Sequence, residues 1–65
     1  MSIISSQKIY QNGKPYGYIT LEVKLATYYV NFNLFGISVP VETVKTDDYN
    51  YAMHKFIIKK NKYNK

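Results

Sequence analysis

A chain of 65 residues has room for one domain and one hydrophobic core. It has no cysteine and a single histidine, which excludes disulfides and leaves too few ligands for a structural zinc site. Nine lysines, no arginine and four acidic residues give a net charge of +5, so polyanions and acidic protein surfaces should attract it. We therefore expect one domain over residues 1–65, stabilised by a partner or by a second copy in a homodimer.

The first half of the chain predicts two antiparallel strands. Asn12 and Gly13 readily take the positive φ angles of a two-residue hairpin, so they should join a strand over about residues 3–10 to a second strand from Tyr16. Apolar and polar residues then alternate, which is typical of a strand with one buried face. The inner set is Ile19, Leu21, Val23 and Leu25, and the outer set is Tyr16, Tyr18, Thr20, Glu22 and Lys24.

A third strand is predicted over residues 28–35. Its inner set is Tyr28, Val30, Phe32 and Leu34, and its outer set is Tyr29, Asn31 and Asn33. The link at Ala26-Thr27 has neither glycine nor proline, so a turn and a bulged continuation both remain open. Pro40 has no N–H to donate, which makes residues 37–41 an edge strand or a short extended piece. The sheet should therefore span about residues 3–41, with three or four strands.

The period of the apolar residues changes after Thr46. Thr46 is the expected N-cap, and Asp47 and Asp48 suit the first turn of a helix. A helical apolar stripe follows at Tyr49, Ala52, Met53, Phe56 and Ile57. We expect an α+β fold with one C-terminal helix over about residues 47–60, packed on one face of the sheet, and a basic tail over 61–65. The strand propensity of residues 56–58 leaves a shorter helix and a final strand as the alternative.

Eight tyrosines are too many for so small a core, so several should face water and offer a contact surface. Two surfaces are candidates for binding a partner. On the helix the candidates are Tyr51, Lys55, Ile58 and Lys62, and on the sheet they are Tyr16, Tyr18 and Tyr29. A lysine-rich solvated helix face and ordinary cross-strand tyrosine pairing would explain the same residues without a partner.

Nucleic-acid binding is the alternative use of these surfaces. Its candidate residues are Lys24, Asn31 and Asn33 on the sheet, with Lys59 and Lys60 at the end of the helix. Aromatic rings beside amides and lysines suit base stacking with attraction to phosphate. Because lysine acts as a point charge, the absence of arginine favours contact with the backbone over reading of bases. The lysine-rich end also fits a solubilising disordered tail.

The residues give no support for catalysis. His54 stands alone, and the adjacent Asp47 and Asp48 suit a helix start better than an acid–base pair. Neither metal-ligand spacing nor a phosphate-binding glycine loop is present, so we expect no enzyme activity, no metal and no cofactor. There is no signal peptide or membrane span in the sequence, which predicts a cytoplasmic protein that does not bind membranes.

Residues with AT-rich codons (Phe, Tyr, Met, Ile, Asn and Lys) make up more than half of the chain, a bias common among short phage and mobile-element proteins. The expected function is that of a small interaction protein of this type. It would inhibit or modulate a host or defence complex, one that handles nucleic acid, by steric occlusion. Direct DNA or RNA binding is the first alternative, and a self-assembling structural oligomer is the second.

Overall fold

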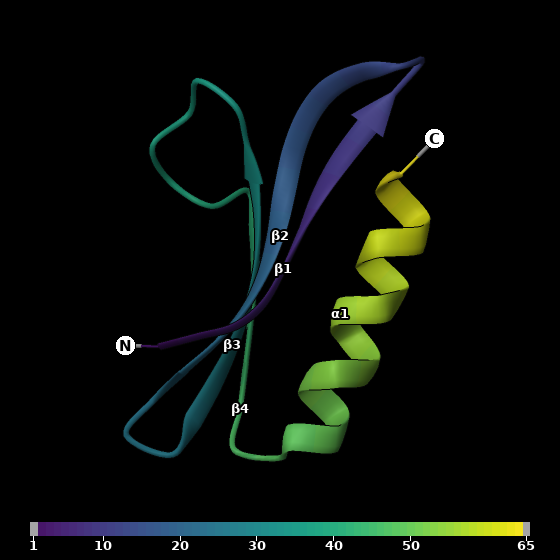
Figure 1. Ribbon diagram of the computed structural model, residues 1–65. Helices are drawn as coiled ribbons and strands as arrows, with labels where there is room; N and C mark the ends of the chain where they lie inside the picture. The colour runs from purple at the N-terminus through teal and green to yellow at the C-terminus, as the bar shows by residue number, and fades with distance from the viewer. Residues whose placement is uncertain (1, 65) are drawn as a thin grey trace.

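The computed structural model describes residues 2–64 as one antiparallel sheet with a helix on one face (Figure 1). The strands are β1 (Ser2–Gln11), β2 (Lys14–Lys24), β3 (Thr27–Leu34) and β4 (Glu42–Thr46), and the helix α1 (Tyr49–Tyr63) follows them. The strands lie side by side in chain order, β1-β2-β3-β4. The predicted α+β fold, with four strands and one C-terminal helix, is therefore confirmed.

Two tight turns connect the first three strands. Asn12 and Gly13 have φ angles of 54° and 77°, as predicted for a two-residue hairpin turn. Leu25 and Ala26 join β2 to β3 with φ angles of 50° and 63°, so this link is a turn and not a bulge. Leu25 was expected on the inner face but is 90% exposed at the tip of the turn. Left-handed backbone is costly for residues that carry a Cβ, so the second turn is strained.

The fourth strand lies later in the chain than predicted. Residues 37–41 form a loop, and β4 pairs with β3 through Val30↔Val44 and Phe32↔Glu42. Gly36, with φ of 84°, turns the chain after β3, and Pro40 lacks the N–H that a ladder needs. The sheet therefore extends to Thr46 instead of ending near residue 41.

A bulge interrupts the predicted alternation of β2 at Tyr16. β1 pairs with β2 through Ile9↔Gly17 and then Tyr10↔Pro15, which leaves Tyr16 as an extra residue. The ring centroid of Tyr16 lies 6.2 Å from that of Phe32, a core residue on the helix side. Tyr16 therefore does not share the outer face with Tyr18, because an extra residue shifts the side-chain alternation by one position.

The start of the helix also differs from the expectation. Asp48 is the N-cap, and its Oδ1 accepts hydrogen bonds from the N–H groups of Asn50 at 2.9 Å and Tyr51 at 3.4 Å. Thr46 is the last residue of β4, and its Oγ1 accepts from the N–H of Asp48 at 3.1 Å. The aspartate takes the cap because Thr46 is held in the sheet by its pairing with Tyr28.

The helix is longer than predicted. It runs without interruption to Tyr63, so the alternative of a final strand is wrong for the described residues. Lys62, which was expected in a tail, is helical. Of the expected tail, Lys65 lies outside the described residues.

The core lies between the helix and the inner face of the sheet. It consists of Ile9, Ile19, Leu21, Val30, Phe32, Ala52 and Phe56. Of the predicted helical stripe, Ala52 and Phe56 are buried and Met53 packs against the core, whereas Tyr49 and Ile57 are 42% and 43% exposed. The inward-facing residues follow a narrower spacing of four, three and four residues, which is typical of a two-positions-per-heptad seam. They are Ala52, Phe56, Lys59 and Tyr63.

Candidate interaction surfaces

Tyrosine side chains remain at the surface, as the composition predicted. Five of the eight are exposed to between 36% and 46%, and none is fully buried. The exposed five are Tyr10, Tyr16, Tyr18, Tyr49 and Tyr51. They are spread over both faces of the molecule, so exposure alone does not define one contact surface.

Hydrogen-bonded polar side chains occupy the centre of the outer sheet face. Asn31 Nδ2 donates to Glu22 Oε2 at 2.6 Å, and Asn31 Oδ1 accepts from Thr43 Oγ1 at 2.9 Å. Thr20 Oγ1 donates to the same Glu22 oxygen at 3.2 Å, and Asn33 is only 9% exposed. The two asparagines that were expected to contact nucleic acid are therefore engaged or buried. The carboxylate of Glu22 lies at the centre of this face, and its negative charge would repel a phosphate.

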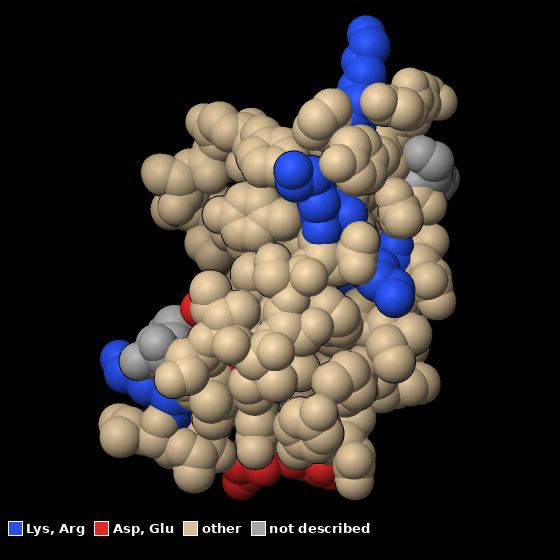
Figure 2. Space-filling view, in the orientation of Figure 1, with Lys and Arg blue, Asp and Glu red and all other residues tan. Residues whose placement is uncertain are grey.

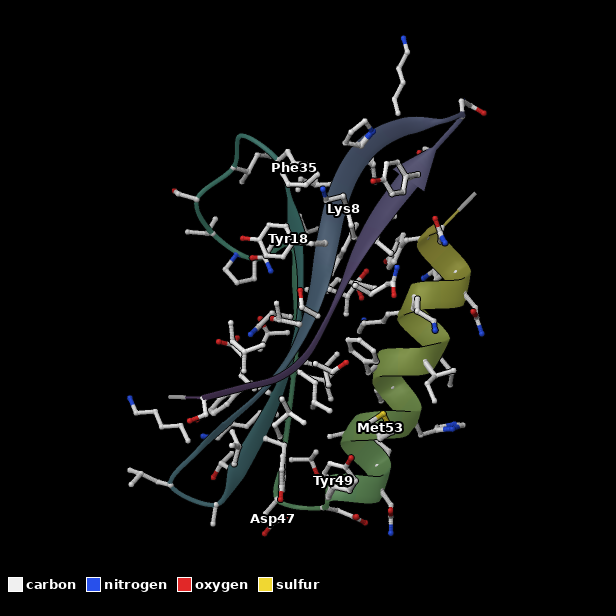
Figure 3. The ribbon with its side chains drawn as sticks, viewed as in Figure 1. Lys8, Tyr18, Phe35, Asp47, Tyr49 and Met53 are labelled. Carbon is white, nitrogen blue, oxygen red and sulfur yellow. The ribbon has the colours of Figure 1, made fainter. Side chains whose placement is uncertain are left out.

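The loop over residues 35–41 projects from the sheet on the side opposite α1 (Figure 1). Its ends are fixed to the sheet, since the N–H of Phe35 donates to Tyr16 O at 3.2 Å and that of Val41 donates to Phe32 O at 2.7 Å. The rings of Phe35 and Tyr18 contact each other at a tilt of 43°, with centroids 5.7 Å apart (Figure 3). The loop and the outer face of β2 therefore share an aromatic contact.

Together these residues form what we term the outer-face patch: Tyr18, Phe35, Ile37, Val39 and Val41. The four loop members are between 47% and 64% exposed. The chain carries no charge from Leu25 to Val41, and the loop appears in Figure 2 as an uncharged lobe. Except for Tyr18, sequence reasoning missed this patch, because the alternating Phe35, Ile37, Val39 and Val41 were assigned to strands. Gly36 and Pro40 were the signals for a loop.

The predicted helix face is present on the other side of the molecule. Tyr51 and Ile58 are 46% and 42% exposed, and Lys55 Nζ lies 5.5 Å from the Tyr51 ring centroid. Lys62 follows on the same face, with its Nζ 5.1 Å from the ring of Tyr63. Intrahelical cation–π contacts thus hold both lysines close to the helix surface.

The predicted partner-binding residues are therefore divided between surfaces. Tyr18 belongs to the outer-face patch, and Tyr16 lies on the helix side. Tyr29 is half-buried on the outer face and pairs with Lys45, beyond the polar centre. Tyr18 lies on the side of the sheet away from α1, which carries the four helix residues (Figure 3). One partner surface cannot cover them all at once without wrapping around the domain.

Lys59 has a structural role. It is 9% exposed, and its Nζ forms an ion pair with Oε2 of Glu42 on β4. The other oxygen, Oε1, accepts from Tyr63 OH, and the Tyr63 ring stacks on Phe32 with centroids 4.1 Å apart. These contacts join the end of α1 to β4. Of the cations proposed for nucleic acid, Lys24 is exposed and Lys60 is half-buried, but Lys59 is not accessible.

Three lysines lie together at one end of the molecule. The β1–β2 turn, with Lys14, lies beside the end of α1, which carries Lys60 and Lys62, because Tyr10 N donates to Asn64 Oδ1 at 3.2 Å. Figure 2 shows several lysines on this upper part of the molecule, and at the lower end it shows acidic residues with further lysine side chains to the left. The acidic end carries Asp47 (Figure 3). The molecule is therefore electrically polarised along its length.

Within residues 2–64, no group of acidic, histidine or cysteine side chains is arranged to hold a metal ion, and no pocket is present. The helix in this part of the chain is too short and too polar to cross a membrane. Comparison of the chain with protein-family models, with curated proteins and with solved structures finds no match.

Proposed function

We propose that this chain is a non-enzymatic interaction protein that acts by covering a surface of a larger assembly. The observation that carries the proposal is the outer-face patch, in which an uncharged loop presents four exposed apolar side chains, one of which, Phe35, contacts Tyr18. Clustered apolar residues on a soluble domain mark interaction sites more often than scattered ones do. Removing such a surface from water requires no charged group to be desolvated.

The loop is also ordered in the unbound molecule, which favours docking. Its two ends are fixed by hydrogen bonds to Tyr16 and Phe32, so its position is set before a partner arrives. A surface that is already ordered loses little conformational freedom on binding. Aromatic side chains at the centre of an interface commonly dominate its affinity, and here Tyr18 and Phe35 take that place. We assign the role of anchors to these two rings.

The kind of partner follows from the charge and the composition. Lysines at one end would steer the molecule toward an acidic protein or a nucleic-acid-bearing assembly, while the uncharged patch makes the close contact. We therefore propose a host or defence complex that handles nucleic acid, inhibited or modulated by steric occlusion. The bias toward AT-rich codons supports a phage or mobile-element source. The helix face with Tyr51, Lys55, Ile58 and Lys62 is proposed as a secondary contact.

Direct DNA or RNA binding receives less support. Three of its five candidate residues are engaged in the fold, since Asn31 is hydrogen-bonded, Asn33 is buried and Lys59 is paired with Glu42. The two candidates left are far apart in the fold, since Lys24 adjoins the β2–β3 turn and Lys60 lies near the end of α1. Such an arrangement predicts weak, salt-sensitive binding only.

Two matched double variants test the proposal. Phe35→Ser with Val39→Ser removes two exposed apolar side chains from the patch, and Tyr51→Ser with Ile58→Ser removes two from the helix face. The assembly captured from host lysate by the parent is purified, and its affinity for each variant is measured by calorimetry. We expect the patch variant to lose about thirtyfold or more in affinity, as for hot-spot truncation, and the helix variant to lose less.

Circular dichroism establishes that both variants are folded. Equal affinity of the parent and the folded patch variant would overturn the assignment of the patch. Occlusion also requires that the bound parent block the assembly from engaging its own ligand. A complex that forms but leaves this engagement unchanged would refute the proposed mode of action.

A further inference from the structure

We propose that the free edge of β1 pairs antiparallel with β1 of a second copy. The two sheets would then form one continuous eight-stranded sheet with both helices on the same face. The proposal rests on β1 and on the adjoining flank of α1, and it does not depend on the partner assembly or on the outer-face patch.

β1 is the first strand of the sheet, so among the described residues 2–64 one of its edges has no neighbouring strand. Two hydrogen bonds identify which backbone groups face outward. Tyr10 N donates to Asn64 Oδ1, and Lys8 O accepts from Gln7 Nε2 at 3.1 Å, so the outward residues at this end are Tyr10 and Lys8. By strict alternation, the N–H and C=O of Ser6 also face outward. The side chains of Asn64 and Gln7 thus bond to the edge at Tyr10 and Lys8. Within residues 2–64, no side chain bonds to the outward backbone groups of Ser6.

The open half of the edge is uncharged. No charged residue occurs between Ser2 and Gln7, although the whole chain carries +5. Figure 2 shows this region as an uncharged area between the lysines above and the acidic residues below. Two equally charged molecules repel least when they meet at such a surface, so the edge suits a second copy. Natural edge strands usually carry charges, prolines or bulges against pairing, and here only Lys8 and a bulge near Ile4 serve.

The flank of the helix supports a second copy over an isolated foreign strand. Ile4, the extra residue of the β1 bulge, is 42% exposed, whereas Ile3, which is 62% exposed, pairs with Glu22 and so lies on the outer face. Ile57 is 43% exposed and precedes Asn64 by seven residues, or about two helical turns, so it lies on the side of α1 that meets β1. A two-fold axis at the β1 edge would bring strand and helix flank of each copy toward those of the other. An added peptide strand would cover the strand residues and leave Ile57 in water.

The axis is placed at Ser6. In that register Ser6 opposes Ser6 of the second copy, and Lys8 faces the uncharged stretch around the Ile4 bulge, so no lysine faces another across the pair. A two-fold contact of this kind closes on itself, because the same edge is used by both molecules. The product is a dimer and not a fibre.

Sedimentation equilibrium tests the proposal with two variants of equal net charge, Ser6→Lys at the edge and Ser38→Lys in the outer loop. Both serines are exposed, so neither change disturbs the core. We expect the parent and Ser38→Lys to sediment at twice the mass of one chain at micromolar concentration. In Ser6→Lys two lysines would meet at the axis, and the dissociation constant should rise at least about tenfold. A monomeric parent, or equal dissociation constants for the two variants, would overturn the proposal.

A second measurement fixes the register. The chain contains no cysteine, so Ser6→Cys introduces a single thiol. Directly opposed residues of an antiparallel pair have Cα atoms about 4.5–5.5 Å apart, within the range that a disulfide spans. Mild oxidation should therefore convert Ser6→Cys to a covalent dimer much faster than Ser38→Cys. Equal rates of disulfide formation for the two thiols would contradict pairing at this edge.

Discussion

Gly17 lies where β2 follows its bulge and passes β3, and the missing side chain sets how closely the two strands approach. Gly17 pairs with Leu34, and a Cβ at this position would collide with the backbone oxygen of Asn33. Gly17→Ala should therefore lower the free energy of unfolding by roughly 1–3 kcal/mol, the usual cost of overpacking. Urea titration followed by circular dichroism measures it, with the exposed Ser38→Ala as control. A change within about 0.5 kcal/mol of the parent would show that the strands separate easily.

The residues that sequence reasoning misplaced share a cause: each depends on a contact that only the fold creates. Lys59 was expected as a free cation because nothing in the helix sequence shows that Glu42 faces it from β4. Tyr16 followed the alternation of β2 until an extra residue in the pairing with β1 moved it to the helix side. By contrast, Ile19, Leu21, Val30 and Phe32 were placed correctly, because alternation alone determines which face they occupy.

Among the elements, the two hairpin turns have the same length and similar backbone angles but very different sequences. Asn12-Gly13 suits positive φ, whereas Leu25-Ala26 adopts it against the preference of both residues. Leu25→Asn with Ala26→Gly should therefore raise the free energy of unfolding by about 1–2 kcal/mol. Leu25 is 90% exposed, so no packing is lost. Urea titration compares this variant with the reciprocal Asn12→Leu and Gly13→Ala, which should be less stable than the parent. Two changes of the same sign would contradict the assignment of strain.

The elements themselves were predicted to different degrees, and the turns explain why. Local sequence signals were strong enough to predict the Asn-Gly hairpin, the strands β2 and β3 and the helix. β4 was displaced because residues 37–41 alternate like a strand, although Pro40 and Gly36 prevent pairing there. The helix start was displaced because Thr46 and Asp48 are both good caps, and the pairing of Thr46 with Tyr28 decides between them. The outer-face patch lies mostly on this loop. Because residues 37–41 were assigned to a strand, the patch was not identified from the sequence.

The charge distribution is a property of the whole molecule. At the lower end Lys24 and Lys45 share the region with Asp47 and Asp48, and in the middle Glu42 neutralises Lys59. The net positive charge therefore acts from the upper end, where α1 ends beside the β1–β2 turn (Figure 2). Binding to any polyanion should depend on this end and not on the total charge.

Two variants of equal charge test this. Lys60→Gln with Lys62→Gln changes the upper end, and Lys24→Gln with Lys45→Gln removes the same charge from the lower end. Fluorescence anisotropy with random duplex DNA over a range of salt concentrations should give weak binding by the parent, with Kd of about 10⁻⁴–10⁻⁶ M at physiological salt. The upper-end variant should reduce the slope of log K against log salt by about one to two, since each phosphate contact contributes roughly 0.9, and the lower-end variant should change it little. Equal slopes for both variants would show that the total charge, and not the position of the lysines, determines binding. A parent Kd near 10⁻⁸ M or below, of the order seen for specific binding, would instead favour nucleic acid itself as the partner, in place of an assembly covered by the outer-face patch.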